Sequence, residues 1–177
     1  MKTIVYFYSH KNSNRFLAHK IAADLNCEIE EIKPRLNAHY LMLMSFNFGN
    51  TKLKNKVEDY DSVILCGPIW MGKLIVPLKN FVNNHISKIN KLIFVTCCGS
   101  TFDKKDEKFG HNLVFKEVKK LSREKCIHCE AFPIGLVLPD GQKEDSDAFM
   151  KTHLNDENFK SEIVGIYDNF IKKLKEI

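Results

Sequence analysis

The sequence has no apolar run that approaches the length of a membrane span. A transmembrane helix needs about 20 mainly apolar residues, and every apolar run here is shorter. The first residues enter a strand pattern at once, without the charged start and small-residue cleavage site of a secretory signal. We therefore expect a cytoplasmic protein, and its 177 residues are most simply one domain spanning 1–177.

Signatures of metal and nucleic-acid binding are also missing. The seven histidines show no HxxxH or similar pairing. The motif Cys126-Ile-His-Cys129 has CxxC spacing, but there is no second pair to complete a zinc site. The net charge of +5 is spread over segments of mixed sign, without the basic stripe typical of nucleic-acid binding. The sequence predicts no metal site and no nucleic-acid partner, and it favours a structural CxxC motif over dithiol or metal chemistry.

What the sequence does contain is a regular alternation of strand and helix patterns. Short β-branched and aromatic runs predict strands, and apolar residues spaced three or four apart predict amphipathic helices. The strands are predicted around Val5 and Phe7 and at 27–33, 62–66, 91–96 and 131–138, and the helices at 16–25, 77–82, 109–121 and from Asn155 onward. Five strands alternating with helices predict a doubly wound α/β fold, a parallel sheet with helices on both faces.

Residues 35–50 fit this alternation least well. The centre of the segment, His39 to Phe48, is apolar almost throughout but is far too short to cross a bilayer. We expect a core helix here. An apolar flap or a contact between subunits is the alternative, because methionine and aromatic side chains suit adaptable binding surfaces.

Three irregular loops follow the predicted strands, at residues 9–14, 68–72 and 97–100. In a doubly wound sheet, ligands bind beyond the carboxyl ends of the strands, where the strand order reverses. The first loop leads into a helix N-terminus, which favours an anion such as a phosphate monoester. The second loop contains the only tryptophan, and the third adds small residues and backbone N–H groups. Together the loops suit a ligand with a phosphate at one end and a planar ring at the other.

These residues resemble the flavodoxin-like family of FMN proteins. The segment YDSVILCGPIWMGKLIVPLKNFV (60–82) is similar to that family's third strand and ring-binding loop, and FVTCCGS (94–100) to its fourth strand and third loop. Residues 9–14 stand at the phosphate loop but depart from its usual threonine, glycine, asparagine and threonine. Asn12 tolerates a positive φ better than most residues, and Ser13 and Asn14 keep hydrogen-bond donors. We therefore expect anion binding to survive.

The resemblance implies a five-stranded flavodoxin-like sheet of order 2-1-3-4-5, with FMN in the crevice. The FMN contacts that it implies are Ser9, His10, Lys11, Asn12, Ser13, Asn14, Pro68, Ile69, Trp70, Met71, Gly72, Cys97, Cys98, Gly99 and Ser100. We expect Trp70 to line the ring site; packing against Leu78 and Phe81 is the alternative.

The resemblance also implies a redox function. As an FMN-dependent oxidoreductase, the protein would pass electrons from NAD(P)H to a quinone or another small acceptor, with the dinucleotide stacking transiently because no GxGxxG fingerprint is present. The alternatives are a flavodoxin that carries single electrons between partner proteins and a module that has lost FMN. Electron-transfer flavodoxins are strongly acidic, so a sequence pI near 8.8 favours the enzyme. A homodimer is one option for the assembly.

The six cysteines predict thiols rather than disulfides, because they lie mostly in apolar runs and a cytosolic pool keeps them reduced. Cys97 and Cys98 are adjacent and cannot easily bridge each other. They are expected to contact the flavin, but the sequence shows no base that would make either a catalytic thiol.

Overall fold

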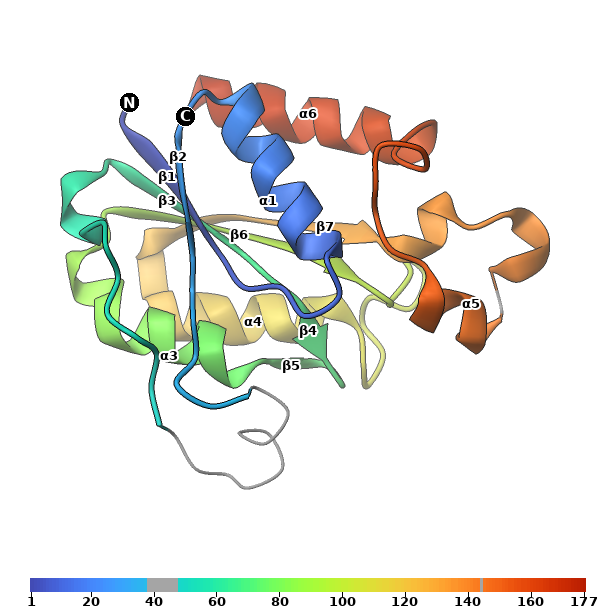
Figure 1. Cartoon of the computed structure of the whole chain (residues 1–177), viewed down its shortest axis with the longest axis horizontal. Coiled ribbons are helices and arrows are strands. Elements are labelled where there is room, and N and C mark those ends of the chain that lie inside the picture. Colours follow the sequence, from blue (N-terminus) through green and yellow to red (C-terminus); the bar gives the residue numbers. More distant parts are fainter. Residues whose placement is uncertain (38–47, 144) are drawn as a thin grey trace.

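The computed structural model describes residues 1–37, 48–143 and 145–177, and its centre is a parallel sheet (Figure 1). The sheet contains β1 (Thr3–Phe7), β2 (Glu28–Glu31), β3 (Ser62–Cys66), β6 (Lys91–Cys98) and β7 (Cys126–Pro133). The spatial order is β2-β1-β3-β6-β7, and each neighbouring pair is parallel. Because β4 and β5 form a separate hairpin, this is the predicted order 2-1-3-4-5. The predicted fold class is confirmed.

Helices cover both faces of the sheet (Figure 1). Helices α1 (Ser13–Asp24) and α6 (Glu162–Glu176) pack on one face, and α3 (Val76–His85) and α4 (His111–Ser122) pack on the other. Successive strand residues point to opposite faces, so β3 sends Ile64 to the α1–α6 side and Val63 and Leu65 to the α3–α4 side. A strand covered on both faces must be apolar throughout, and this explains the uninterrupted apolar run of β3.

Short elements connect these layers. A fifth described helix, α5 (Ser146–Lys151), lies beside the carboxyl end of the sheet (Figure 1). The 3₁₀ turns are Val57–Asp59, Ile86–Lys88, Arg123–Lys125, Ile134–Val137 and Asp140–Gln142. Within residues 1–37, 48–143 and 145–177, no helix combines the length and the apolar character needed to cross a bilayer.

The last strand differs from its prediction. It runs from Cys126 to Pro133 rather than from 131 to 138, and Ile134–Val137 forms a 3₁₀ turn. Pro133 has no backbone N–H with which to continue the ladder, which accounts for the earlier end. The strand lies at the edge of the sheet. The CxxC motif is therefore part of the strand and does not precede it.

The last two long helices begin later than predicted. Asn155 closes a local turn in which its Oδ1 accepts hydrogen bonds from the backbone N–H groups of Glu157 and Asn158, both at 3.0 Å, and α6 starts only at Glu162. Phe109 likewise precedes α4. Asparagine stabilises isolated turns as well as helix starts, so the sequence pattern alone does not distinguish them. The core helix predicted at 39–48 lies outside the described residues, except for Phe48.

Candidate functional site

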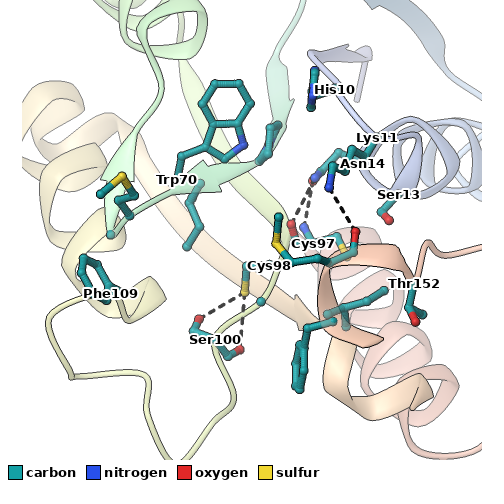
Figure 2. A pocket seen from close by; sticks show the side chains of 18 of the residues that line it. His10, Lys11, Ser13, Asn14, Trp70, Cys97, Cys98, Ser100, Phe109 and Thr152 are labelled. Carbon is teal, nitrogen blue, oxygen red and sulfur yellow. Dashed lines mark hydrogen bonds between the residues drawn. The ribbon is translucent and has the colours of Figure 1, made fainter. Parts of the chain in front are cut away.

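A cavity of about 780 Å³ lies at the carboxyl ends of the strands (Figure 2). Its volume falls within the range of roughly 300–1,000 Å³ that is usual for small-molecule sites. The structure brings the loops at 9–14, 68–72 and 97–100 together around it, and every contact implied by the resemblance lines it except Asn12.

The first loop enters α1 through Asn12, which adopts a left-handed conformation with a φ of 67°. No side chain caps the N-terminus of α1, and its first turn contains no acidic residue. Beside it, the Ser9 Oγ is buried and has no hydrogen-bond partner within the part of the chain that the structure describes. A buried hydroxyl without a partner is costly, and a helix N-terminus attracts anions. The loop therefore fits a phosphate group that would supply the missing acceptor.

Two other residues of this loop bind the segment around α5. The Lys11 Nζ donates a hydrogen bond to the Met150 carbonyl at 3.0 Å, and the Ser13 Oγ accepts one from the Leu154 backbone N–H at 3.1 Å. Residues 149–153 consequently form a wall of the cavity, to which Phe149, Met150, Thr152 and His153 contribute.

Asn14 joins the first loop to the third loop, and its role as an anion donor stays a prediction. The residue is 5% exposed. Its Nδ2 donates to the Cys97 carbonyl at 3.1 Å, and its Oδ1 accepts from the Cys97 backbone N–H at 2.8 Å (Figure 2). Both ends of the amide are thus engaged by one residue of the third loop. Asn14 positions two loops relative to each other.

The second loop is a small hairpin rather than the irregular segment that was predicted. Strands β4 (Ile69–Trp70) and β5 (Lys73–Leu74) pair in antiparallel fashion. Met71 and Gly72 between them have φ values of 52° and 68°, which is the type I′ pattern of two-residue hairpins. A Cβ on Gly72 would lie 2.5 Å from the Lys108 carbonyl oxygen. The glycine lets the hairpin approach the chain that leads into α4.

Trp70 forms a wall between the core and the cavity. Its half-buried indole lines the cavity and meets the His10 ring edge-on, with centroids 5.6 Å apart (Figure 2). The same side chain also packs against the apolar cluster that contains Leu78 and Phe81. Trp70 therefore packs against the core, which was one alternative, and also lines the cavity that is the candidate ring site.

The third loop contains a hydrogen-bonded group that the sequence did not reveal. The Ser100 Oγ lies 2.8 Å from the His111 Nδ1, and the Cys98 Sγ lies 3.4 Å from the Ser100 Oγ and 3.9 Å from the same ring nitrogen. Burial raises the pKa of Cys98 to about 11 and that of Cys97 well above its usual value. Burial also lowers the pKa of His111, so its imidazole is neutral near neutral pH.

His111 is a buried imidazole next to Ser100 and Cys98 that the sequence did not indicate. It is the first residue of α4 and is 2% exposed. A separation of 11 residues from Ser100 matches no short motif, so no signal in the sequence joins them. A neutral imidazole bonded to a hydroxyl at the cavity wall can take up or return a proton at the Ser100 Oγ.

Three exposed apolar side chains form the rim of the cavity: Met71, Phe109 and Met150, with exposed fractions of 70%, 53% and 63%. We call this group the apolar rim. Phe109 was assigned to the apolar stripe of a helix, and Met150 was not assigned to any element. The other lining residues that the sequence did not indicate are Lys104, Glu107, Gly110, Ile134, Phe149, Thr152 and His153.

Comparisons with known proteins identify the family. The flavodoxin domain model matches residues 28–138, which is more than half of the chain, and the protein belongs to this family. No curated protein sequence matches it.

Several solved structures share the fold. A flavoprotein in complex with FMN from Lactobacillus acidophilus is 15% identical, with 73% of this chain and 92% of that chain covered and a TM-score of 0.59. A flavodoxin from Streptococcus pneumonia TIGR4 is 11% identical, with 99% of each chain covered and a TM-score of 0.53. An NADPH-quinone reductase from P. pentosaceus is 17% identical, with 88% and 99% covered and a TM-score of 0.51. At these identities, the likeness establishes the fold alone.

Proposed function

We propose that the protein binds FMN in this cavity and acts as an oxidoreductase that passes electrons from NAD(P)H to a small acceptor such as a quinone. The observation that carries the proposal is the meeting of an uncapped helix N-terminus, a half-buried indole and a third loop around one cavity. The solved structures that share the fold include a flavoprotein in complex with FMN and an NADPH-quinone reductase. When bound, FMN supplies a ring that accepts and returns electrons.

The residues divide into a phosphate end and a ring end. Ser9 and the N-terminus of α1 would hold the phosphate, since a buried hydroxyl and free helical N–H groups are suitable donors. Trp70 and residues 97–100 would hold the ring, because an indole face and backbone groups suit a planar heterocycle. No acidic residue of the α1 first turn opposes the anion.

The apolar rim and the Ser100–His111 pair support a small acceptor. Exposed apolar side chains at a cavity mouth exclude water and suit a flat organic ligand. Reduction of a quinone requires protons as well as electrons. A neutral His111 bonded to Ser100 provides a group at the wall that can relay one.

An absorbance spectrum and a titration with FMN test the proposal directly. The purified protein, or its apo form after addition of FMN, should show flavin absorbance and bind one equivalent. Riboflavin should bind at least about tenfold more weakly, since charge-assisted bonds to a phosphate contribute more than 1.4 kcal/mol. A colourless protein that ignores added FMN contradicts the proposal, and equal affinities place the phosphate away from residues 9–14.

The variant Ser9→Ala tests whether the Ser9 hydroxyl binds the phosphate of FMN or stabilises the fold. The Ser9 hydroxyl has no partner among the described residues, so its removal should leave the apo protein equally or more stable. FMN affinity should nevertheless fall, because the phosphate loses a donor. Ser87→Ala, which changes an exposed serine, is the control and should alter neither quantity. Lower apo stability with unchanged affinity for FMN would give Ser9 a structural role.

An electron carrier is the second candidate. The apolar rim would equally suit docking of a partner protein, although the sequence pI near 8.8 is opposite to that of acidic carriers. Steady-state NAD(P)H oxidation with FMN and a quinone, and with no other protein, distinguishes the two. Turnover that requires both FMN and the quinone supports the enzyme. Negligible turnover that is restored by a flavoprotein reductase supports the carrier.

A further inference from the structure

Two thiols lie close together at the amino end of β7, far along the strand from the cavity. The Cys126 and Cys129 sulfurs are 3.5 Å apart, and both residues are half-buried. Strand β7 is an edge strand, so one side of its ladder has no neighbouring strand. Both residues keep part of their surface exposed to solvent.

A β-bulge brings these two side chains onto one face of the strand. In a regular strand, residues three apart point to opposite faces. Here the register passes from Leu92–Cys126 to Ile93–His128, so Ile127 is an extra residue. Cys126 and Cys129 consequently both pack against the cluster on the α3–α4 side. His128 points the other way and stacks on Phe170 of α6.

The surroundings make the two sulfurs chemically unequal. A hydrogen bond from Cys129 lowers the pKa of Cys126 to about 7, with smaller contributions from the Ser122 hydroxyl and the Lys119 ammonium. The pKa of Cys129 is raised, because its proton is shared with Cys126 and the site is partly buried. Of the two thiols, Cys126 is therefore the one that ionises more readily.

The two thiols have few candidate metal ligands around them among the described residues. Across the ranges that the structure describes, no group of three His, Cys, Asp or Glu side chains could hold a metal ion. A pair of close thiols without further ligands is instead suited to thiol–disulfide exchange.

We propose that Cys126 and Cys129 form a redox-active dithiol that is oxidised reversibly to an intramolecular disulfide by small-molecule disulfides such as glutathione disulfide. The Cys126 thiolate attacks one sulfur of the small disulfide, whose S–S bond breaks and releases one thiolate. Cys129 then loses its proton and attacks the Cys126 sulfur of the mixed disulfide, releasing the second thiolate. The protein loses two electrons and two protons, and the small disulfide becomes two thiols.

Closure requires a modest movement. A disulfide bond is about 2.0 Å long, so the two sulfurs must approach by about 1.5 Å. Ile127, whose side chain is 40% exposed, is the bulged residue and has no partner in the β6–β7 register, so the strand can take up the shift there. A disulfide that is partly exposed and that forms only with a shift of the strand is readily reduced again by thiols, which makes the step reversible.

Mass mapping after incubation with glutathione disulfide tests the proposal, and it needs no FMN. Reduced wild-type protein should lose the free thiols of Cys126 and Cys129 together, with a mass decrease of two hydrogen atoms and only a transient glutathione adduct. Dithiothreitol should restore both thiols. A wild-type protein that keeps both free thiols, or that accumulates a stable adduct, contradicts the proposal.

Single variants assign the roles of the sulfurs. Cys129→Ser should trap a stable glutathione adduct on Cys126, because no second sulfur can displace it. Cys126→Ser should form neither adduct nor disulfide at position 129. The matched control is Cys27→Ser, since Cys27 is also half-buried and burial raises its pKa to about 11; this variant should oxidise as the wild type does. Equal adduct formation at Cys27 and Cys126 would overturn the inference, and the wild-type mass change tests it even if a variant fails to fold.

Discussion

The protein has two pairs of cysteines at opposite ends of the neighbouring strands β6 and β7. One pair is Cys97 and Cys98, and the other is Cys126 and Cys129. Cys97 and Cys98 pair with Phe132 and Pro133 at the carboxyl end, whereas Cys126 pairs with Leu92 at the amino end. The first two thiols are almost completely buried, and burial raises their pKa values. The second two are half-buried, and Cys126 has a lowered pKa.

The difference teaches that adjacency in sequence is a poor guide to thiol chemistry in a strand. Neighbouring strand residues point to opposite faces, so Cys97 and Cys98 have separate surroundings, and only Cys98 reaches His111. A bulge brings residues three apart together and gives Cys126 a hydrogen-bond donor. The carboxyl end therefore provides thiols that remain protonated, and the amino end provides a thiolate.

The largest expected effect is in alkylation rates. With pKa values of about 7 and about 11, the thiolate fractions of Cys126 and Cys27 near neutral pH differ by about 10³–10⁴. The more basic thiolate is the better nucleophile, which offsets part of this difference. We expect iodoacetamide to modify Cys126 at least about 100-fold faster than the equally half-buried Cys27. The rate at Cys126 should level off above about pH 8 while the rate at Cys27 continues to rise.

Quantitative mass spectrometry of each cysteine peptide gives these rates. Cys129→Val removes the hydrogen bond that contributes most to the lowered pKa of Cys126, so it should slow alkylation of Cys126 and leave Cys27 unchanged. Equal alkylation rates at Cys126 and Cys27 in the wild type would show that the pKa of Cys126 is not lowered, and the two ends of the sheet would then not differ in thiol chemistry.

The second effect concerns the buried end. Asn14→Ala leaves both the N–H and the C=O of Cys97 without the partners that Asn14 supplies. Each buried group that loses its partner costs about 1–3 kcal/mol, so we expect the free energy of unfolding to fall by about 2–4 kcal/mol. Urea denaturation measures this, and Asn83→Ala, at an exposed position of α3, should change it by less than about 0.5 kcal/mol. A loss below about 1 kcal/mol in Asn14→Ala would mean that the two loops hold each other by other contacts.

The features that could be predicted from the sequence are those that depend on many residues. The strand order and the convergence of three loops follow from chain-wide alternation and from the topology of doubly wound sheets. Strand β3 was predicted with its observed bounds because both of its faces are buried and its apolar run is continuous. Such features depend on patterns of many residues, so single exceptions do not obscure them.

Features that depend on one local irregularity could not be predicted. The bulge at Ile127 has no glycine or other marker, so the CxxC spacing gave no sign that the two sulfurs meet. His111 reaches Ser100 only because the chain between them loops back. The hairpin turn has a Met-Gly pair where Asn-Gly is the recognised signal. In each case, tertiary structure determines a contact that no sequence periodicity encodes.

A third prediction examines the cavity wall. Trp70→Ala should weaken FMN binding by up to about tenfold from the lost ring contact alone, since aromatic pairs contribute about 0.5–1.5 kcal/mol beyond burial. FMN should quench the fluorescence of this only tryptophan. The variant should also melt earlier, because the indole packs against the core cluster. Trp70→Phe should retain most of the affinity; normal FMN binding by Trp70→Ala would place the ring elsewhere.

The smallest expected effect is a pH dependence of stability from His111. Burial, followed by the charge of Lys105, lowers its pKa in the folded protein, so the unfolded chain binds a proton more readily. Stability from this group is therefore complete above the unfolded pKa of about 6.5 and is lost as the pH falls below it, by no more than about 1.4 kcal/mol per pH unit. His85 acts in the same direction, because burial also lowers its pKa.

Urea unfolding between about pH 6 and pH 5 follows these histidines, because Cys126, with a pKa of about 7, is largely protonated there and Glu58 and Asp140 have lowered pKa values and titrate below this range. His111→Gln should be less stable at neutral pH, having lost the bond to Ser100, but its stability should fall less steeply on acidification. His85→Gln should show the shallower slope without disturbing the Ser100 hydroxyl. If His111→Gln kept the full wild-type slope, folding would leave the pKa of the imidazole unchanged. A steeper slope in His111→Gln would instead mean that folding raises this pKa, and the carboxyl end would then lose the neutral base that distinguishes it from the amino end.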